Sequence, residues 1–171
     1  MSTKTATMAA QKRIALIAHD NLKKDLVDWC IKNEATLKSH FLCGTGTTAR
    51  LIAEATGLPV KAYKSGPLGG DQQIGALIAD GAIDLVIFFS DPLEAQPHDP
   101  DIKALMRIAA VYDIPFANNR ATADFIMKSS YLNDTYTHEL KDFTLITQNR
   151  AKTISGKRCQ IICSLRLVCS L

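Results

Sequence analysis

Several features typical of membrane, metal-binding and nucleic-acid-binding proteins are missing from this sequence of 171 residues. No apolar run approaches the roughly 20 residues that a membrane-spanning helix needs. The five cysteines, at positions 30, 43, 159, 163 and 169, are odd in number and form no CxxC pair and no zinc-binding spacing with histidine. A disulfide framework and a zinc site are therefore not expected.

Acidic residues are absent from residues 148–171, which hold five basic ones. The remaining residues hold 15 basic and 17 acidic side chains, so the body of the chain is slightly acidic. A body that binds nucleic acid needs a basic face, so no nucleic-acid partner is expected. The first apolar run, residues 14–18, is too short for a signal peptide. We therefore expect a cytoplasmic protein with reduced thiols.

Short apolar runs alternate with helical patterns along most of the chain. Strands are predicted over residues 13–18, 40–43, 60–63, 85–89 and 114–117, and helices over 22–33, 49–56, 71–80, 102–112 and 122–129. This alternation predicts a mainly parallel five-stranded sheet with helices on both faces, a doubly wound (Rossmann-like) α/β fold. We expect a single such domain over residues 12–150, a flexible segment over 1–11 and a poorly ordered tail over 151–171.

Polar residues follow each predicted strand. Ligands of a doubly wound sheet bind beyond the carboxyl ends of its strands, and five chemically distinct loops converge on that edge. These loops contain His19-Asp20, Gly44–Thr48, Ser65–Asp71, Asp91–His98 and Asn118. The convergence predicts a polar ligand site there.

The run Gly44-Thr45-Gly46-Thr47-Thr48 before a helix is typical of a phosphate site. Glycines let backbone N–H groups approach an anion, hydroxyls donate hydrogen bonds, and the helix start adds partial positive charge. Lys23, Ser65 and Gly66 could complete this cradle. The run matches neither the Walker pattern nor GxGxxG, so a nucleotide is not implied. The alternative is a turn and helix start without a ligand, beside a solvated lysine.

Three side chains at this edge suit proton transfer. Asp71 stands at a predicted helix start, where the helix dipole keeps a carboxylate ionised and available as a base; the alternative is a simple N-cap. His19 and His98 could relay protons between two oxygens, because imidazole titrates near neutral pH. No cysteine stands beside either histidine, so a Cys–His nucleophile is not expected.

The chain from about residue 12 to 150 resembles the methylglyoxal synthase family. The resemblance rests on four motifs, Ala18-His19-Asp20, Gly44–Thr48, Ser65–Gln73 and Asp91–Asp101, of which the last two are long and specific. Arg120, where the family more often has valine, and the tail after residue 150 depart from the pattern. The resemblance implies conversion of dihydroxyacetone phosphate to methylglyoxal and inorganic phosphate by a metal-free lyase without a cofactor, usually a homohexamer.

The resemblance also implies roles for individual residues. Asp71 would be the catalytic base, with His19, His98 and Asp101 in the catalytic cluster. Arg150 would reach the phosphate of a neighbouring subunit, and inorganic phosphate, as product, should compete at the cradle. The residues implied to contact substrate are His19, Lys23, Thr45, Gly46, Thr47, Thr48, Ser65, Gly66 and His98.

Two alternatives use similar features. A regulatory ligand-binding module would need the phosphate cradle but not Asp71 with two histidines, and such modules usually belong to long multidomain chains. A phosphosugar isomerase would form the same enediolate intermediate from the same substrate. Assay of both possible products from dihydroxyacetone phosphate separates these functions.

Overall fold

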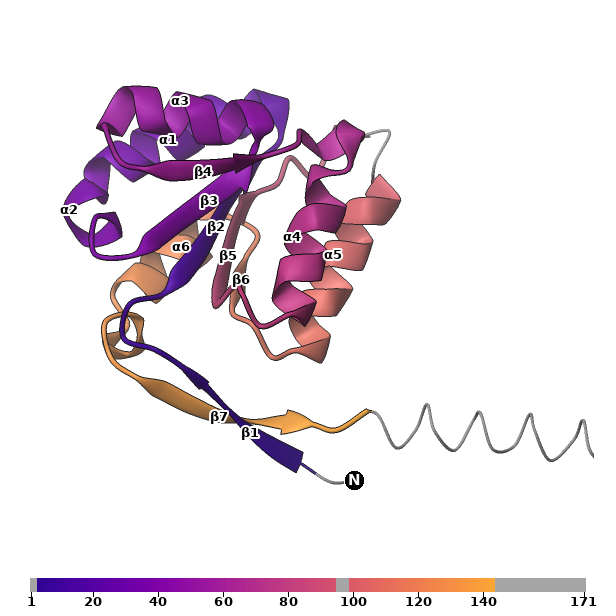
Figure 1. Ribbon diagram of the computed structural model, residues 1–171. Helices are drawn as coiled ribbons and strands as arrows, with labels where there is room; N and C mark the ends of the chain where they lie inside the picture. The colour runs from indigo at the N-terminus through magenta and orange to yellow at the C-terminus, as the bar shows by residue number, and fades with distance from the viewer. Residues whose placement is uncertain (1–2, 95–98, 144–171) are drawn as a thin grey trace, which may run out of the picture. The chain divides into compact units, whose positions relative to one another are not determined.

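The computed structural model describes residues 3–94 and 99–143. Five parallel strands form one sheet in the order β4-β3-β2-β5-β6 (Figure 1). Helices pack on both faces, so the predicted doubly wound α/β fold is confirmed. The strands are β2 (Arg13–Ala18), β3 (Phe41–Thr45), β4 (Val60–Tyr63), β5 (Leu85–Phe89) and β6 (Phe116–Ala117).

The helices divide between the two faces of the sheet. In Figure 1, α1, α3 and α6 cover one face, and α4 and α5 cover the other. None of the described helices is long and apolar enough to cross a membrane. The α-helices are α1 (Lys23–Lys32), α2 (Glu34–Leu37), α3 (Gly46–Thr56), α4 (Gly70–Ala79), α5 (Asp99–Val111) and α6 (Arg120–Met127), and short 3-10 turns are η1 (Asp20–Leu22), η2 (Gly66–Leu68) and η3 (Ser130–Leu132).

The central strand β2 is buried on both faces, which explains its apolar sequence. Ile14 and Leu16 pack into the core beneath α1 and α3, while Ala15 and Ile17 pack into the core beneath α4 and α5. Because β2 pairs with β3 on one side and β5 on the other, the carboxyl ends of these three strands lie together. The loops that follow them are therefore held at one edge.

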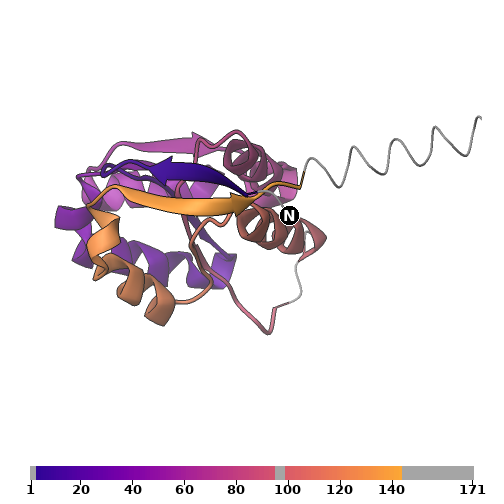
Figure 2. The ribbon, with the colours of Figure 1, turned by 90° about the horizontal axis from the view of Figure 1, so that it is seen from below.

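A separate two-stranded sheet pairs β1 (Thr3–Met8) with β7 (Tyr136–Lys141) (Figure 2). The sequence predicts a flexible segment over residues 1–11 and gives no sign of β1, because Met8 alone in this strand is buried. Among the described residues, 6–138 belong to one compact unit, and 3–5 with 139–143 belong to a second. The domain boundaries at residues 12 and 150 stay predictions, and the tail 151–171 lies outside the described residues.

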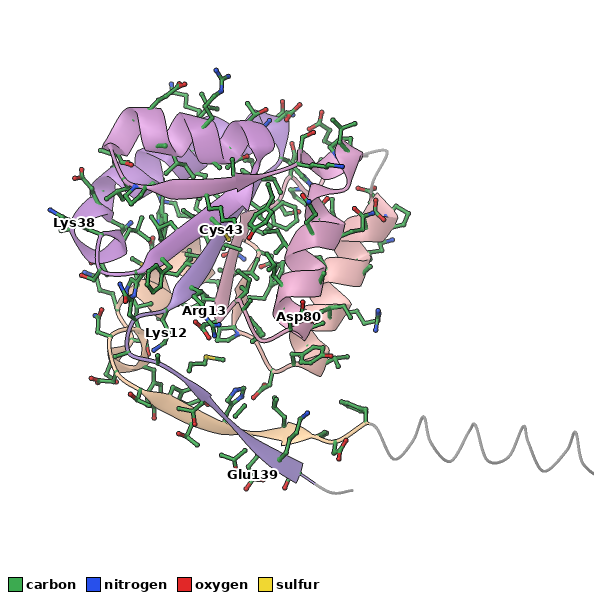
Figure 3. All side chains as sticks on the ribbon, in the orientation of Figure 1. Lys12, Arg13, Lys38, Cys43, Asp80 and Glu139 are labelled. Carbon is green, nitrogen blue, oxygen red and sulfur yellow. The ribbon has the colours of Figure 1, made fainter. Side chains whose placement is uncertain are left out.

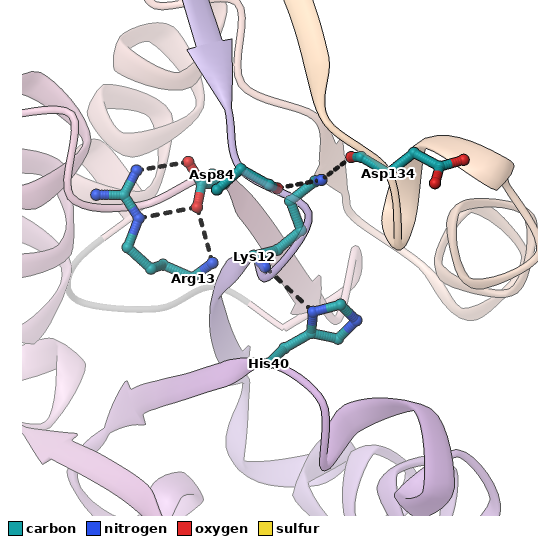
Figure 4. Close-up of polar contacts among 6 residues, drawn as sticks. Lys12, Arg13, His40, Asp84 and Asp134 are labelled. Atoms are coloured by element: carbon teal, nitrogen blue, oxygen red, sulfur yellow. Dashed lines mark hydrogen bonds and ion pairs between the residues drawn. The ribbon is translucent and has the colours of Figure 1, made fainter.

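The buried Lys12 and Asp84 and the half-exposed Arg13 connect the amino end of β2 to neighbouring segments (Figures 3 and 4). The Arg13 guanidinium donates to both oxygens of Asp84, at 2.8 and 2.6 Å. The Lys12 ammonium donates to the carbonyl oxygens of Ala9 and Asp134, at 2.5 and 2.6 Å. Burial lowers the pKa of Lys12, although the nearby Asp84 carboxylate opposes that shift. These contacts lie at the end of the sheet opposite to the predicted site.

Candidate active site

A pocket of about 230 Å³ opens at the carboxyl ends of the strands. It draws its walls from the loops that follow β2, β3 and β4, as the sequence analysis predicted for a ligand site. Eight of the predicted site residues line it: His19, Lys23, Thr45, Thr47, Thr48, Ser65, Gly66 and Asp71.

The turn from β3 into α3 lies directly against the loop after β4. The backbone N–H of Gly46 donates to the Lys64 carbonyl at 3.2 Å. A Cβ atom on Gly46 would stand 3.0 Å from the Ser65 backbone nitrogen, so glycine permits this close approach. Gly46 is not part of the pocket wall; it brings the threonine turn and Ser65 together.

Thr48 presents a buried hydroxyl to the pocket. The residue is 1% exposed, and its Oγ1 makes no hydrogen bond to any described part of the chain. Burying a hydroxyl without a partner costs about 1–3 kcal/mol. Thr48 lies in the first turn of α3, where free backbone N–H groups and the helix dipole attract anions. A bound phosphate oxygen at this turn would accept the missing hydrogen bond.

Asp71 is a buried carboxylate, 3% exposed, in the first turn of α4. The sequence allows Asp71 to be the N-cap, but Gly69 occupies that position in the left-handed conformation (φ 93°). The N-cap thus lies two residues before Asp71, and Asp71 lies inside the first turn of α4 rather than capping it. The carboxylate is therefore placed on the pocket wall, close to the positive end of α4.

His19 is held in one tautomer. Its Nδ1 accepts a hydrogen bond from the backbone N–H of Asp91 at 3.0 Å. A peptide N–H can only donate, so the proton of the neutral imidazole is on Nε2. The ring packs edge-on against Phe88, with 5.0 Å between ring centroids. His19 is thus a buried, oriented donor at the pocket.

Lys23 brings a positive charge to the pocket from the first turn of α1. Its Nζ lies 2.5 Å from Oδ1 of Asp20, which also lines the pocket. This ion pair is partly exposed, so it orients the ammonium more than it stabilises the fold. The pocket therefore combines a cation, hydroxyl donors and a helix N-terminus, which is the donor set that a phosphate dianion needs.

Besides Gly46, three predicted site residues are not part of the pocket's described wall. Asp101 lines an adjoining cavity between α4 and α5, which Asp71 also lines. His98 and Arg150 lie outside the described residues, so their roles stay predictions.

Phe88 and Pro67 line the pocket but were missed as site residues. Phe88 belongs to the apolar run of β5, and Pro67 belongs to the Ser65–Asp71 loop. The only feature of the sequence that could have marked them as site residues is their position near the ends of predicted strands. The two cysteines of the described chain, Cys30 and Cys43, are both buried. Burial raises their pKa to about 12 and about 11, so neither supplies a thiolate nucleophile.

The described residues contain no cluster of three or more His, Cys, Asp or Glu side chains that could hold a metal ion. The pocket's polar lining includes the carboxylates of Asp20 and Asp71, the His19 imidazole, the Lys23 ammonium and several hydroxyls.

Comparison with known proteins agrees with this geometry. Residues 25–118 match the family model of the MGS-like domain. The chain is 58% identical over 136 residues to a methylglyoxal synthase of Clostridium acetobutylicum, covering 80% of this chain and 94% of the relative. It is 53% identical over 152 residues to one from Pectobacterium atrosepticum, covering 89% and 100%.

A solved structure is similar as well. The crystal structure of methylglyoxal synthase from Elizabethkingia anophelis NUHP1 superposes with a TM-score of 0.78 at 50% identity, covering 82% of this chain and 92% of that one. Fold and sequence agree across most of the chain's length. The chain belongs to the methylglyoxal synthase family.

Proposed function

We propose that this chain converts dihydroxyacetone phosphate to methylglyoxal and inorganic phosphate. The observation that carries the proposal is one pocket lined by the buried Asp71 carboxylate, the oriented His19 imidazole and the threonine turn. A base, a proton donor and a phosphate cradle are the parts that elimination of phosphate from a ketose phosphate requires. Family membership supports the same reaction.

Asp71 acts as the base. It removes a proton from the hydroxymethyl carbon beside the ketone, which leaves an enediolate whose neighbouring carbon bears the phosphoester. The Nε2–H of His19 donates to a substrate oxygen as negative charge develops. His98 is proposed, from the family resemblance, to relay protons between the two enediolate oxygens, and Asp101 to belong to the same catalytic cluster.

The threonine turn directs the elimination. The phosphoester C–O bond must stand out of the enediolate plane, so that its electrons overlap the π system when phosphate departs. Lys23 and the hydroxyls of Thr45, Thr47 and Thr48 hold the phosphate in that orientation, with Ser65 and Gly66 on the opposite loop. The enol that forms takes a proton on carbon to become methylglyoxal. An isomerase would hold the same bond in the plane and keep the phosphate.

Arg150 is proposed to reach the phosphate of a neighbouring subunit in a homohexamer. Inorganic phosphate is proposed to inhibit by occupying the cradle that it leaves as product. The reaction proposed here needs no metal and no cofactor, and its proposed location is the cytoplasm. These four statements rest on the family resemblance and the sequence analysis.

The test is to incubate the purified chain with dihydroxyacetone phosphate and to measure methylglyoxal, inorganic phosphate and glyceraldehyde 3-phosphate. Equal release of methylglyoxal and phosphate is expected. Glyceraldehyde 3-phosphate alone would identify an isomerase, and binding without turnover would identify a regulatory module.

Asp71→Asn should lower kcat by at least about a thousandfold, because an amide cannot take the proton. Phosphate binding, measured by calorimetry, should persist, because the cradle is unchanged. Asp80→Asn, at the exposed carboxyl end of the same helix, is the matched control and should keep normal turnover. Near-normal activity of Asp71→Asn would remove Asp71 as the base.

A further inference from the structure

Asn21 joins two loops at the edge of the active-site pocket without lining the pocket itself. It lies in η1, directly after β2, and its Nδ2 donates to Asp91 Oδ2 at 3.3 Å and to Glu94 Oε2 at 3.0 Å. Both acceptors belong to the segment that follows β5. One amide group thus donates hydrogen bonds to two carboxylates about 70 positions further along the chain. An ionised aspartate at position 21 has no N–H and could not donate to them.

The second oxygen of Asp91 fixes the local backbone. Oδ1 accepts hydrogen bonds from the backbone N–H groups of Leu93 at 2.9 Å and Glu94 at 3.3 Å. The pKa of Asp91 is lowered by the Leu93 N–H first and by the Asn21 amide next, as expected for a carboxylate held by donors. The Asp91 side chain is therefore tied to its own turn on one oxygen and to Asn21 on the other.

This arrangement aims the backbone N–H of Asp91 at His19. That N–H donates to His19 Nδ1 at 3.0 Å and thereby keeps the proton of the neutral ring on Nε2. The backbone N–H of His19 in turn donates to the Phe89 carbonyl at 3.1 Å. The two loops are joined on both sides of the imidazole, and Asn21 supplies the side-chain link between them.

We infer that Asn21 is a positioning residue for the reaction: it holds the Asp91 backbone so that the His19 imidazole keeps its Nε2–H donor directed at the substrate. This role rests on the proposed function, because the donor matters only if His19 acts on a substrate oxygen. Asn21 touches no reacting atom and acts through its hydrogen bonds to Asp91 and Glu94. Its loss leaves the threonine turn and Lys23 in place.

The test compares Asn21→Ala and Asn21→Asp with the wild-type chain. Asn21→Ala, which removes the amide, should lower kcat about tenfold. Asn21→Asp, whose carboxylate repels Asp91 and Glu94, should lower kcat about a hundredfold. Both losses are smaller than or equal to what a general acid–base group usually contributes. KM should stay within about twofold, since phosphate binding is untouched. Gln11→Glu adds the same single charge at an exposed position before β2 and should keep normal kcat.

A spectroscopic measurement separates positioning from general structural support. Nitrogen-15 NMR of histidine-labelled protein, without substrate, should show one protonated and one unprotonated ring nitrogen for His19 in the wild type. The Asn21 variants should show averaged signals from both tautomers. Because this measurement needs no turnover, it still tests Asn21 if the chain makes no methylglyoxal. A normal kcat, or a lowered kcat with an unchanged tautomer, would overturn the inference.

Discussion

At the scale of the residue, the Thr48 hydroxyl is the clearest sign that the pocket is built for an anion. The fold buries this polar atom and gives it no partner among the described residues, at a cost in stability. Thr45, in the same turn, is buried as well, whereas Thr47 is exposed. A ligand that accepts a hydrogen bond from Thr48 offsets that cost when it binds.

Thr48→Val tests this interpretation, because valine keeps the shape and removes the hydroxyl. The dissociation constant for inorganic phosphate should rise about tenfold, the equivalent of one hydrogen bond to a charged group. The free energy of unfolding should stay the same or rise, since no protein contact is lost. Calorimetric titration and urea unfolding measure the two effects.

Thr56→Val is the matched control at the far end of α3. Thr56 donates to the Ile52 carbonyl at 2.7 Å and accepts from the Leu58 N–H at 3.2 Å. This variant should therefore lose stability and keep normal phosphate binding. Phosphate binding that is equally weak in both variants would show that Thr48 has no specific role.

At the scale of the element, the start of α4 depends on a glycine. A Cβ atom on Gly70 would stand 2.0 Å from the Lys64 carbonyl oxygen and 2.9 Å from its carbonyl carbon. Both atoms are backbone, so the helix would have to move away from the Ser65 loop. Asp71 is the next residue, and its place in the pocket depends on the same contact.

Gly70→Ala should therefore lower the free energy of unfolding by more than about 2 kcal/mol and strongly reduce turnover. Gly75→Ala, in the middle of the same helix, meets only the Leu105 methyl group, at 3.9 Å. This second variant should gain about 0.5–1 kcal/mol from the higher helix propensity of alanine and keep its activity. Urea unfolding and the methylglyoxal assay compare the two; equal effects would contradict the steric argument.

Sequence patterns located the apolar elements well. The predicted strands over residues 13–18, 60–63 and 85–89 coincide with β2, β4 and β5. For β2 and β5 the reason is that strands buried in a parallel sheet are apolar along their length, whereas β4 is an edge strand without a fully buried residue. Helix starts were predicted less well. The helix α3 begins at Gly46, not residue 49, because its first turn packs on the Ser65 loop and so overrides the turn preference of Gly and Thr.

Pairing between distant segments was beyond sequence reasoning. The β1–β7 sheet joins strands that lie more than 120 positions apart and bury few residues, so neither strand carries a strong pattern. The loops that form the site could be predicted, because they follow the ends of the predicted strands. The hydrogen bond from Asn21 to Asp91 could not be predicted, because it depends on side chains of two loops meeting in space.

At the scale of the whole molecule, the two ends of the five-stranded sheet differ: one carries the candidate active site and the other carries contacts that stabilise the fold. The carboxyl end holds the pocket, while the amino end holds a polar network in which the buried Lys12, His40 and Asp84 and the half-exposed Arg13 join several segments (Figure 4). The Lys12 backbone N–H donates to His40 Nδ1 at 3.1 Å, so this imidazole must stay unprotonated on that atom. Stability should therefore respond to pH at the end remote from the pocket.

The pKa of His40 determines whether stability rises or falls with pH. Burial lowers this pKa from its ordinary value of 6.5, and the Lys12 ammonium lowers it further. A hydrogen bond to Asn133 opposes the shift. The unfolded chain takes up a proton as pH falls through 6.5, while the folded chain does so only at lower pH. The free energy of unfolding should thus fall between pH 7.5 and pH 5.5. His40→Asn, whose amide oxygen can still accept the Lys12 N–H, should reduce this fall.

Urea unfolding of both proteins at the two pH values, with a reductant present, measures the difference. The other histidines and all carboxylates are common to both chains, so comparing the two falls in stability isolates residue 40. Phosphate binding at pH 7.5 should be the same in both proteins, because the pocket lies at the other end of β2. An equal loss of stability on acidification in the two proteins would mean that protonation of His40 does not cause the loss.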